Sequence, residues 1–207
     1  MSSFKFSVFS FQFSVFSLQF SVISFLLMVL ILFSCVQNNT PKPPAYFRID
    51  FPEREYRMYD TICPFMFEYP VYGNLTYPIP PASDSCWLNI NFPKYKGTIH
   101  LSYRKIDNNL DQLMEDSWKF VYSKIALRAD AVHPREYENP ELNVYGTIYD
   151  IKGDAASTVQ FFVTDSVKHF LRGSLYFFVQ PNYDSLAPAI HFFREDIIHL
   201  METVKWK

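Results

Sequence analysis

The feature that most constrains this chain is an abrupt change of composition at Cys35, which limits where a globular domain can begin. Before Cys35 the residues are mostly bulky and apolar, and Lys5 is the only charged one. After it, the segment VQNNTPKPP is polar and rich in proline, a composition typical of a tether rather than of a packed core. The sequence therefore predicts one globular domain over residues 45–207, long enough to bury a core of its own.

The segment before Cys35 has two parts. In FKFSVFSFQFSVFSLQFSVIS, Phe alternates with Ser or Gln, which is compatible with a strand but is more typical of a low-complexity repeat. The apolar run ISFLLMVLILF has the length of the hydrophobic region of a signal peptide and is too short for a membrane span. We interpret residues 1–34 as a signal peptide and hypothesise that the assigned start codon lies upstream of the true one.

Leu32-Phe33-Ser34-Cys35 resembles a bacterial lipobox, although Phe33 is bulkier than usual at its position. The small Ser34 lets the signal peptidase approach the bond, and the Cys35 thiol accepts diacylglycerol before cleavage. The alternative is an uncleaved signal anchor with an incidental cysteine. The first interpretation predicts lipidation of Cys35, with palmitate-type chains that hold the protein stably on a membrane. Residues 35–44 would then be a tether, and the domain would face the periplasm.

If Cys35 is lipidated, Cys63 and Cys86 remain as an even pair. In an oxidising periplasm they can form one disulfide, and the alternative is two free thiols. The chain has no CxxC motif, and no histidine lies near either cysteine in sequence, so these residues do not indicate a metal or redox site.

Strand-like segments dominate residues 45–207. Where apolar and polar residues alternate, as in Thr98–Ile106, one face of a sheet is expected to be buried. The segment LRGSLYFFVQ is apolar on both faces, which predicts a central strand that is covered on both sides. The predicted strands are Ala45–Asp60, Phe65–Tyr72, Trp87–Phe92, Thr98–Ile106, Val144–Lys152, Ser157–Thr164 and Leu171–Gln180.

Two segments have helical spacing instead. The first follows a predicted capping box of Asn109 and Gln112. The second is predicted to begin at Ser185 or Leu186, with Pro188 in its first turn. Their apolar stripes are Leu110, Leu113, Met114, Trp118, Val121, Tyr122 and Ile125, and then Ile190, Phe193, Ile197, Leu200 or Met201, and Val204. The sequence thus predicts an α+β fold, an antiparallel sheet packed with two long helices, similar to the PsbP/Mog1-like sandwich.

Few residues suggest chemistry. Asp165, Ser166 and His169 could form a nucleophile cluster, but a solvated hairpin turn explains them as well. His191, Glu195 and His199 form one column on the second helix, as either a partial metal site or a polar face. The chain has neither a G-x-S-x-G motif nor a glycine-rich phosphate loop. A net charge of -2 gives no reason to expect nucleic-acid binding. We therefore expect no enzymatic activity, no cofactor and no metal.

Several segments resemble the gliding-motility lipoprotein D (GldD) family of the Bacteroidota. They are PKPPAYFRIDFPE, CPFMFEYPVY, CWLNINFPKYKGTIHLSY, RADAV, VYGTIYDIKGDAASTVQFFVTDSVKHFLRGSLYFFVQPNYDSLAP and EDIIHLMETVKWK. Together they cover almost all of residues 41–207. The resemblance implies a lipid-anchored component of the cell envelope that is needed for gliding motility, in systems linked to type IX secretion, with no known enzymatic activity or cofactor.

Two function classes follow. The favoured one is a non-enzymatic binding or scaffold subunit that contacts other gliding or type IX secretion proteins. The alternative is a periplasmic enzyme or small-ligand-binding lipoprotein, which a deep pocket with convergent His, Asp and Arg would favour. The predicted interaction surface is Thr164, Asp165, Ser166, His169, Arg172, Asn182, Tyr183 and Asp184, although Asp and Asn in such turns can simply fix backbone geometry.

Overall fold

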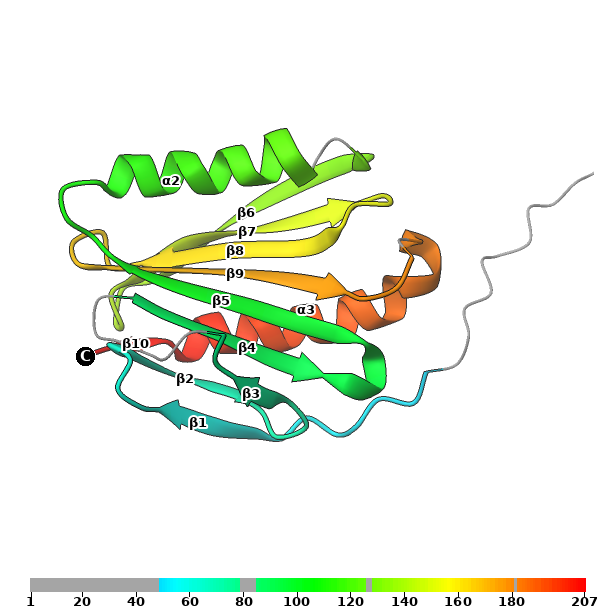
Figure 1. The fold of residues 1–207 in the computed structure, drawn as a ribbon. Helices are drawn as coiled ribbons and strands as arrows, with labels where there is room; N and C mark the ends of the chain where they lie inside the picture. Colours follow the sequence, from blue (N-terminus) through cyan, green and yellow to red (C-terminus); the bar gives the residue numbers. More distant parts are fainter. Residues whose placement is uncertain (1–48, 79–84, 126–127, 181) are drawn as a thin grey trace, which may run out of the picture. The chain divides into compact units, whose positions relative to one another are not determined.

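Two antiparallel sheets and two helices make up the part of the chain that the structure describes. The computed structural model describes residues 49–78, 85–125, 128–180 and 182–207. The large sheet contains, in spatial order, β3 (Asn74–Thr76), β4 (Ser85–Phe92), β5 (Gly97–Lys105), β9 (His169–Phe177), β8 (Ser157–Thr164), β7 (Val144–Lys152) and β6 (Ala131–Asn139). The small sheet contains β1 (Tyr56–Asp60), β2 (Phe65–Pro70) and β10 (Lys205–Trp206). The α+β class predicted from the sequence is confirmed (Figure 1).

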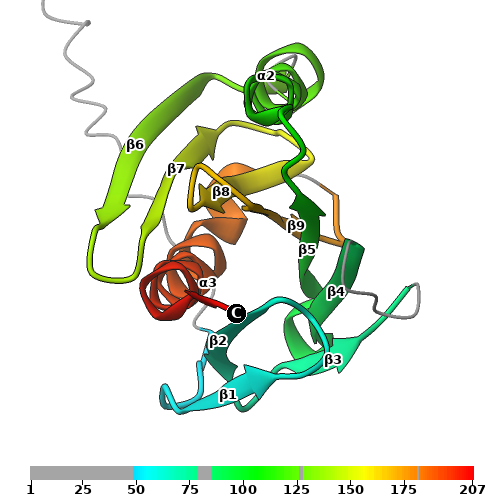
Figure 2. The same cartoon turned by 90° about the vertical axis from the view of Figure 1, so that its left-hand side faces the viewer.

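Each face of the large sheet packs against a different helix (Figure 2). Helix α3 (Tyr183–Thr203) and the small sheet pack on one face and enclose the main core. Helix α2 (Leu110–Lys119) packs on the other face over a smaller core. Alternation along the strands makes this possible, since Phe161 of β8 lies in the main core and Phe162 in the smaller one.

The predicted central strand is confirmed. Strand β9 lies between β5 and β8 in the middle of the seven-stranded sheet. Leu171 and Leu175 belong to the main core and Phe170 to the core under α2. The strand covers His169–Phe177, so it begins and ends earlier than predicted.

Helix α3 has the predicted apolar stripe but begins earlier than predicted. Asn182 is its N-cap, and its side chain accepts a hydrogen bond from the backbone N–H of Ser185 at 3.1 Å. Pro188 therefore lies inside the helix, and the prediction that it occupies the first turn is wrong. The stripe of Ile190, Phe193, Ile197, Leu200, Met201 and Val204 is buried.

Helix α2 departs further from its prediction. The capping box is wrong, because the Asn109 side chain accepts from the backbone N–H of Asp107 at 2.9 Å instead of capping the helix. Met114 and Trp118, predicted to be in the core, are 41% and 54% exposed. After α2 the backbone continues as the π-helical segment η2 (Phe120–Ile125), which buries Val121.

Both edge strands of the large sheet, and β10 at the edge of the small one, were not predicted. Strand β6 (Ala131–Asn139) pairs along its whole length with β7 and forms one edge of the large sheet. At the other edge lies the short β3 (Asn74–Thr76). Strand β1 (Tyr56–Asp60) is shorter than the predicted segment, and residues 45–48 of that segment lie outside the described residues.

Cys63 and Cys86 are both buried and are joined by a disulfide, with their Cα atoms 5.9 Å apart. Cys63 lies between β1 and β2, and Cys86 lies in β4. The bond therefore links the small sheet to the large one.

Candidate functional site

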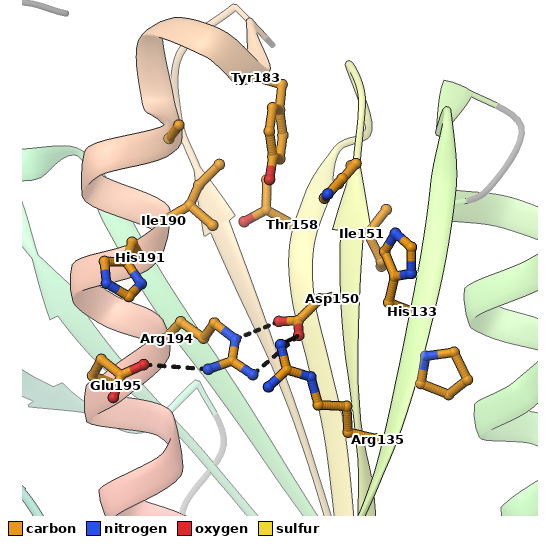
Figure 3. Close-up of a pocket in the computed structure, with 13 residues that line it drawn as sticks. His133, Arg135, Asp150, Ile151, Thr158, Tyr183, Ile190, His191, Arg194 and Glu195 are labelled. Atoms are coloured by element: carbon orange, nitrogen blue, oxygen red, sulfur yellow. Dashed lines mark hydrogen bonds and ion pairs between the residues drawn. The ribbon is translucent and has the colours of Figure 1, made fainter.

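A groove of about 800 Å³ runs between α3 and strands β6 and β7 (Figure 3). One wall is the side of α3 that carries His191 and Arg194, and the opposite wall carries His133 and Arg135 of β6. Asp150 of β7 lies between the two walls. The β6–β7 hairpin and the distant helix α3 thus supply most of the polar lining.

The register of the sheet explains why these side chains meet. On β7, Asp150 follows the main-core residue Ile148 by two positions and so points to the α3 face, whereas Tyr149 and Ile151 pack in the core under α2. Strand β6 pairs with β7 so that His133 lies opposite Asp150.

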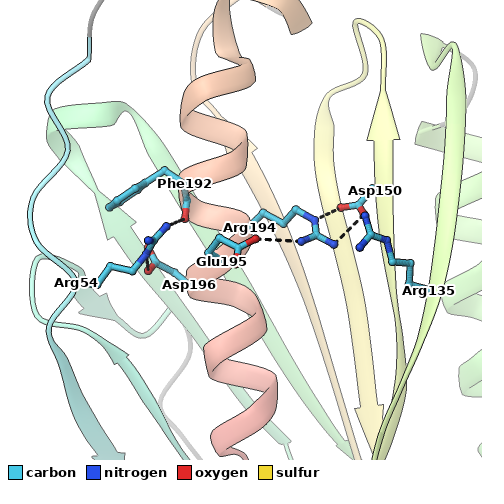
Figure 4. A network of polar contacts seen from close by, with 7 residues as sticks. All are labelled: Arg54, Arg135, Asp150, Phe192, Arg194, Glu195 and Asp196. Atoms are coloured by element: carbon cyan, nitrogen blue, oxygen red, sulfur yellow. Dashed lines mark hydrogen bonds and ion pairs between the residues drawn. The ribbon is translucent and has the colours of Figure 1, made fainter.

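Asp150 is the centre of an ion-pair network across the groove (Figure 4). Arg194 of α3 donates to it through two nitrogens, Nε at 2.6 Å and Nη2 at 3.0 Å. Arg135 of β6 contacts it through Nη2 at 3.3 Å. Arg194 also donates to Glu195 at 3.2 Å, and its hydrogen bond to Asp150 raises the pKa of the guanidinium. The two carboxylates of the groove are therefore both occupied by arginine.

Four other polar side chains of the groove lack such partners in the described part of the chain. Among the described residues, the side chains of Lys152, His133 and His191 make no hydrogen bond or ion pair. The Thr158 hydroxyl is buried and likewise has no hydrogen-bond partner in the described part of the chain. Thr158 lies at an irregularity of β8 between Ser157 and Val159.

A second polar cluster lies on the other side of α3. The Asp196 carboxylate is fully buried and accepts from the hydroxyls of Tyr56 at 2.9 Å and Tyr72 at 2.7 Å. Arg54 approaches it at 3.6 Å and lies over the ring of Phe192 (Figure 4). Burial raises the pKa of Asp196, and the two tyrosines and Arg54 only partly oppose this effect. The cluster ties the segment before β1 and the turn after β2 to α3, and its buried carboxylate is not open to a ligand.

The predicted turn of Thr164–His169 connects β8 and β9, and its side chains hold its backbone. One Asp165 oxygen accepts from the N–H groups of Val167, Lys168 and His169 at 2.8–3.0 Å. Burial raises the pKa of Asp165, but these donors outweigh it and the net shift is downward. The Thr164 hydroxyl donates to the His169 carbonyl.

His169 is held by neighbours other than the predicted Ser166. Its Nδ1 lies 2.9 Å from the Tyr103 hydroxyl, and its ring stacks on Trp206 at 5.1 Å. Burial lowers the pKa of the imidazole. Ser166 adopts a left-handed backbone conformation, with φ 64°. These contacts are those of a structured turn, not of a nucleophile paired with a base.

The structure does not bring the predicted interaction residues into one surface. The turn at Thr164–His169 lies at one end of β9, whereas Asn182, Tyr183 and Asp184 follow the other end (Figure 1). Arg172, in the middle of the strand, packs over the Phe120 ring at 4.3 Å. Within the second group, the Tyr183 N–H donates to Asp154, and Tyr183 also lines the groove.

The column of His191, Glu195 and His199 diverges. His191 lines the groove and Glu195 contacts Arg194, whereas His199 Nε2 lies 2.7 Å from Glu68 of β2 and its ring stacks on Tyr56. Over the described ranges, no group of three or more His, Cys, Asp or Glu side chains is placed to hold a metal ion.

The predicted signal peptide, Cys35 and tether lie outside the described residues. Within the described ranges, no helix has both the length and the apolar character needed to cross a membrane.

Comparisons with known proteins give one structure and one family. The solution structure of cyanobacterial PsbP (CyanoP) from Synechocystis sp. PCC 6803 is similar, with a TM-score of 0.46 and 9% identity over 75% of this chain and 95% of that chain. No curated protein sequence matches. The family model described as gliding motility lipoprotein GldD matches residues 36–206, and the chain therefore belongs to the GldD family of gliding motility lipoproteins.

Proposed function

We propose that this protein is a lipid-anchored subunit of the cell envelope that supports gliding motility, type IX secretion or both by binding other envelope proteins, without catalysing a reaction. The observation that carries the proposal is the match to the GldD family over residues 36–206. The family consists of motility lipoproteins and is not known for enzymatic activity.

The contacts of three carboxylates, Asp150, Asp196 and Asp165, give no support to a catalytic role for them. Asp150 is held by two arginines, Asp196 is enclosed by two tyrosines, and Asp165 is saturated by backbone donors. A general acid or base must reach its substrate, and these carboxylates are occupied by contacts that stabilise the fold.

Localisation follows from the sequence. We propose that lipidation of Cys35 holds the domain on a membrane facing the periplasm and that residues 35–44 act as the tether. Partners would then be other gliding or type IX secretion proteins of the envelope, and the net charge of -2 gives no support to a nucleic-acid partner.

The groove beside α3 favours a second candidate, a small-ligand-binding lipoprotein. It gathers His133, His191, Asp150, Arg135 and Arg194, which is the convergence of residue types expected for a ligand site. The two candidates are compatible if a ligand in the groove accompanies binding to protein partners.

Deletion of the gene in its native bacterium tests the proposed function. We expect loss of colony spreading and of secretion of type IX substrates, both restored by a plasmid copy. Mild crosslinking and affinity purification of the restored protein should recover motility or secretion proteins. Normal spreading together with normal secretion in the deletion strain would refute the proposal.

A further inference from the structure

We propose that the groove between α3 and strands β6 and β7 binds a small molecule with an anionic group, a phosphate or a carboxylate. The inference deepens the proposed binding role and rests on it for its biological meaning. The groove volume of about 800 Å³ lies in the range of small-molecule sites, which favours a small ligand over a protein segment.

The balance of charge in the groove favours an anion. Three lining side chains carry a fixed positive charge, namely Arg135, Arg194 and Lys152, and two carry a negative charge, namely Asp150 and Glu195. Both carboxylates contact arginine. One positive charge is therefore uncompensated within the lining.

The donors that remain available lie around one space. Arg135 contacts Asp150 through Nη2 and is 65% exposed, so the rest of its guanidinium can donate to a ligand. His133 of β6 and His191 of α3 lie on opposite sides of the groove (Figure 3), and Lys152 of β7 also lines it. An anion bound in the groove beside the Asp150–Arg194 ion pair would have hydrogen-bond donors on both walls, Arg135 and His133 on one and His191 on the other.

Thr158 provides an observation independent of charge. Thr158 is only 5% exposed, and its hydroxyl has no hydrogen-bond partner in the described part of the chain. It lines the groove near Tyr183 and Ile190 (Figure 3). An unpaired buried hydroxyl is unfavourable, and a small shift of the side chains that cover it would let a ligand at this end of the groove pair with it.

Titration of the purified mature lipoprotein in mild detergent tests the inference. The probes are inorganic phosphate, citrate and a peptide of glutamates, followed by calorimetry and by the melting temperature at low ionic strength. We expect phosphate or citrate to bind and to raise the melting temperature. The double variant Arg135→Gln, Lys152→Gln should bind at least 10-fold more weakly, because both side chains line the groove and neither is in the core.

The matched control is Lys168→Gln, Lys205→Gln, which removes two exposed charges outside the groove and should leave binding unchanged. Equal binding by both double variants, binding of the peptide alone, or no binding of any probe would each overturn the inference. Normal spreading and secretion in the deletion strain would instead refute the proposed function, whatever the calorimetry shows.

Discussion

At the scale of single residues, Asp196 links stability to pH. Burial raises its pKa above the ordinary value of 3.8, so the folded protein binds this proton more tightly than the unfolded chain does. As pH rises above 3.8 through the folded pKa, the free energy of unfolding should fall, because a buried charge forms. We expect Asp196→Asn to remove this part of the pH dependence, measured by urea unfolding between pH 4 and 7. Parallel pH profiles for the two proteins would contradict the assignment.

Removal of the same acceptor tests the contacts themselves. Asp196→Ala leaves the hydroxyls of Tyr56 and Tyr72 without their acceptor, and we expect a loss of about 2–4 kcal/mol in the free energy of unfolding. Addition of Tyr56→Phe and Tyr72→Phe to this variant should recover part of the loss, because no unpaired hydroxyl remains. No recovery would indicate that packing, not hydrogen bonding, dominates.

The effect of Asp165 on the pH dependence of stability should be opposite to that of Asp196. Backbone donors lower its pKa below 3.8 despite burial, so its contribution to stability is present above that pH and is lost as pH falls through the folded pKa. We expect Asp165→Ala to cost about 1–2 kcal/mol at pH 7, and Asp165→Asn to cost less because an acceptor remains. Urea unfolding at pH 7 and pH 3 measures both, and an equal cost at the two pH values would contradict the charge argument.

At the scale of elements, the disulfide fixes the small sheet to the large one. Its cysteines are separated by 23 positions, and a bond that closes a loop of that size contributes about 3 kcal/mol by restricting the unfolded chain. We expect Cys63→Ser, Cys86→Ser to lower the free energy of unfolding by about this amount, as should reduction of the native protein. Detection of two free thiols after unfolding of the native protein without a reductant would show that the bond does not form.

Elements with a clear apolar period could be predicted from the sequence, and those at edges could not. Strand β7 (Val144–Lys152) and strand β8 (Ser157–Thr164) match their predictions because their buried faces demand apolar residues. Strand β6 has exposed charges and Pro134, which an edge strand tolerates. It lacks the alternation of apolar and polar residues that predicts a strand from sequence. On α2, the exposed Trp118 stacks on Tyr122, a contact that helical spacing cannot distinguish from core packing.

The groove could not be predicted either, because part of its lining lies on an edge strand. His133 and Arg135 lie on the unpredicted β6, and the Asp150–Arg194 pair spans 44 positions of sequence, so only the register of the sheet brings them together. Its sequence signal is slight: one Asp on the face of β7 that also carries the core residue Ile148, and one Arg on α3. The turn at Thr164–His169 was found because turn chemistry is local.

At the scale of the whole molecule, the lipobox makes Cys35 the proposed point of attachment to the membrane. We expect Cys35→Ala to abolish palmitate labelling and to leave the precursor uncleaved, because the peptidase requires the diacylglyceryl cysteine. Cys63→Ser, Cys86→Ser is the matched control and should remain labelled and in the membrane fraction.

Mass spectrometry of the native protein decides between the lipobox and the signal anchor. A lipoprotein begins at an acylated Cys35, whereas a signal anchor retains the apolar residues that precede Cys35 and an unmodified thiol. An alternative outcome is that the Cys35→Ala variant is cleaved, leaves the membrane fraction and still restores spreading to the deletion strain. That result would show that the domain functions without its lipid. Loss of spreading in that variant, with normal folding by circular dichroism, would show that processing and lipidation at Cys35 are needed for function.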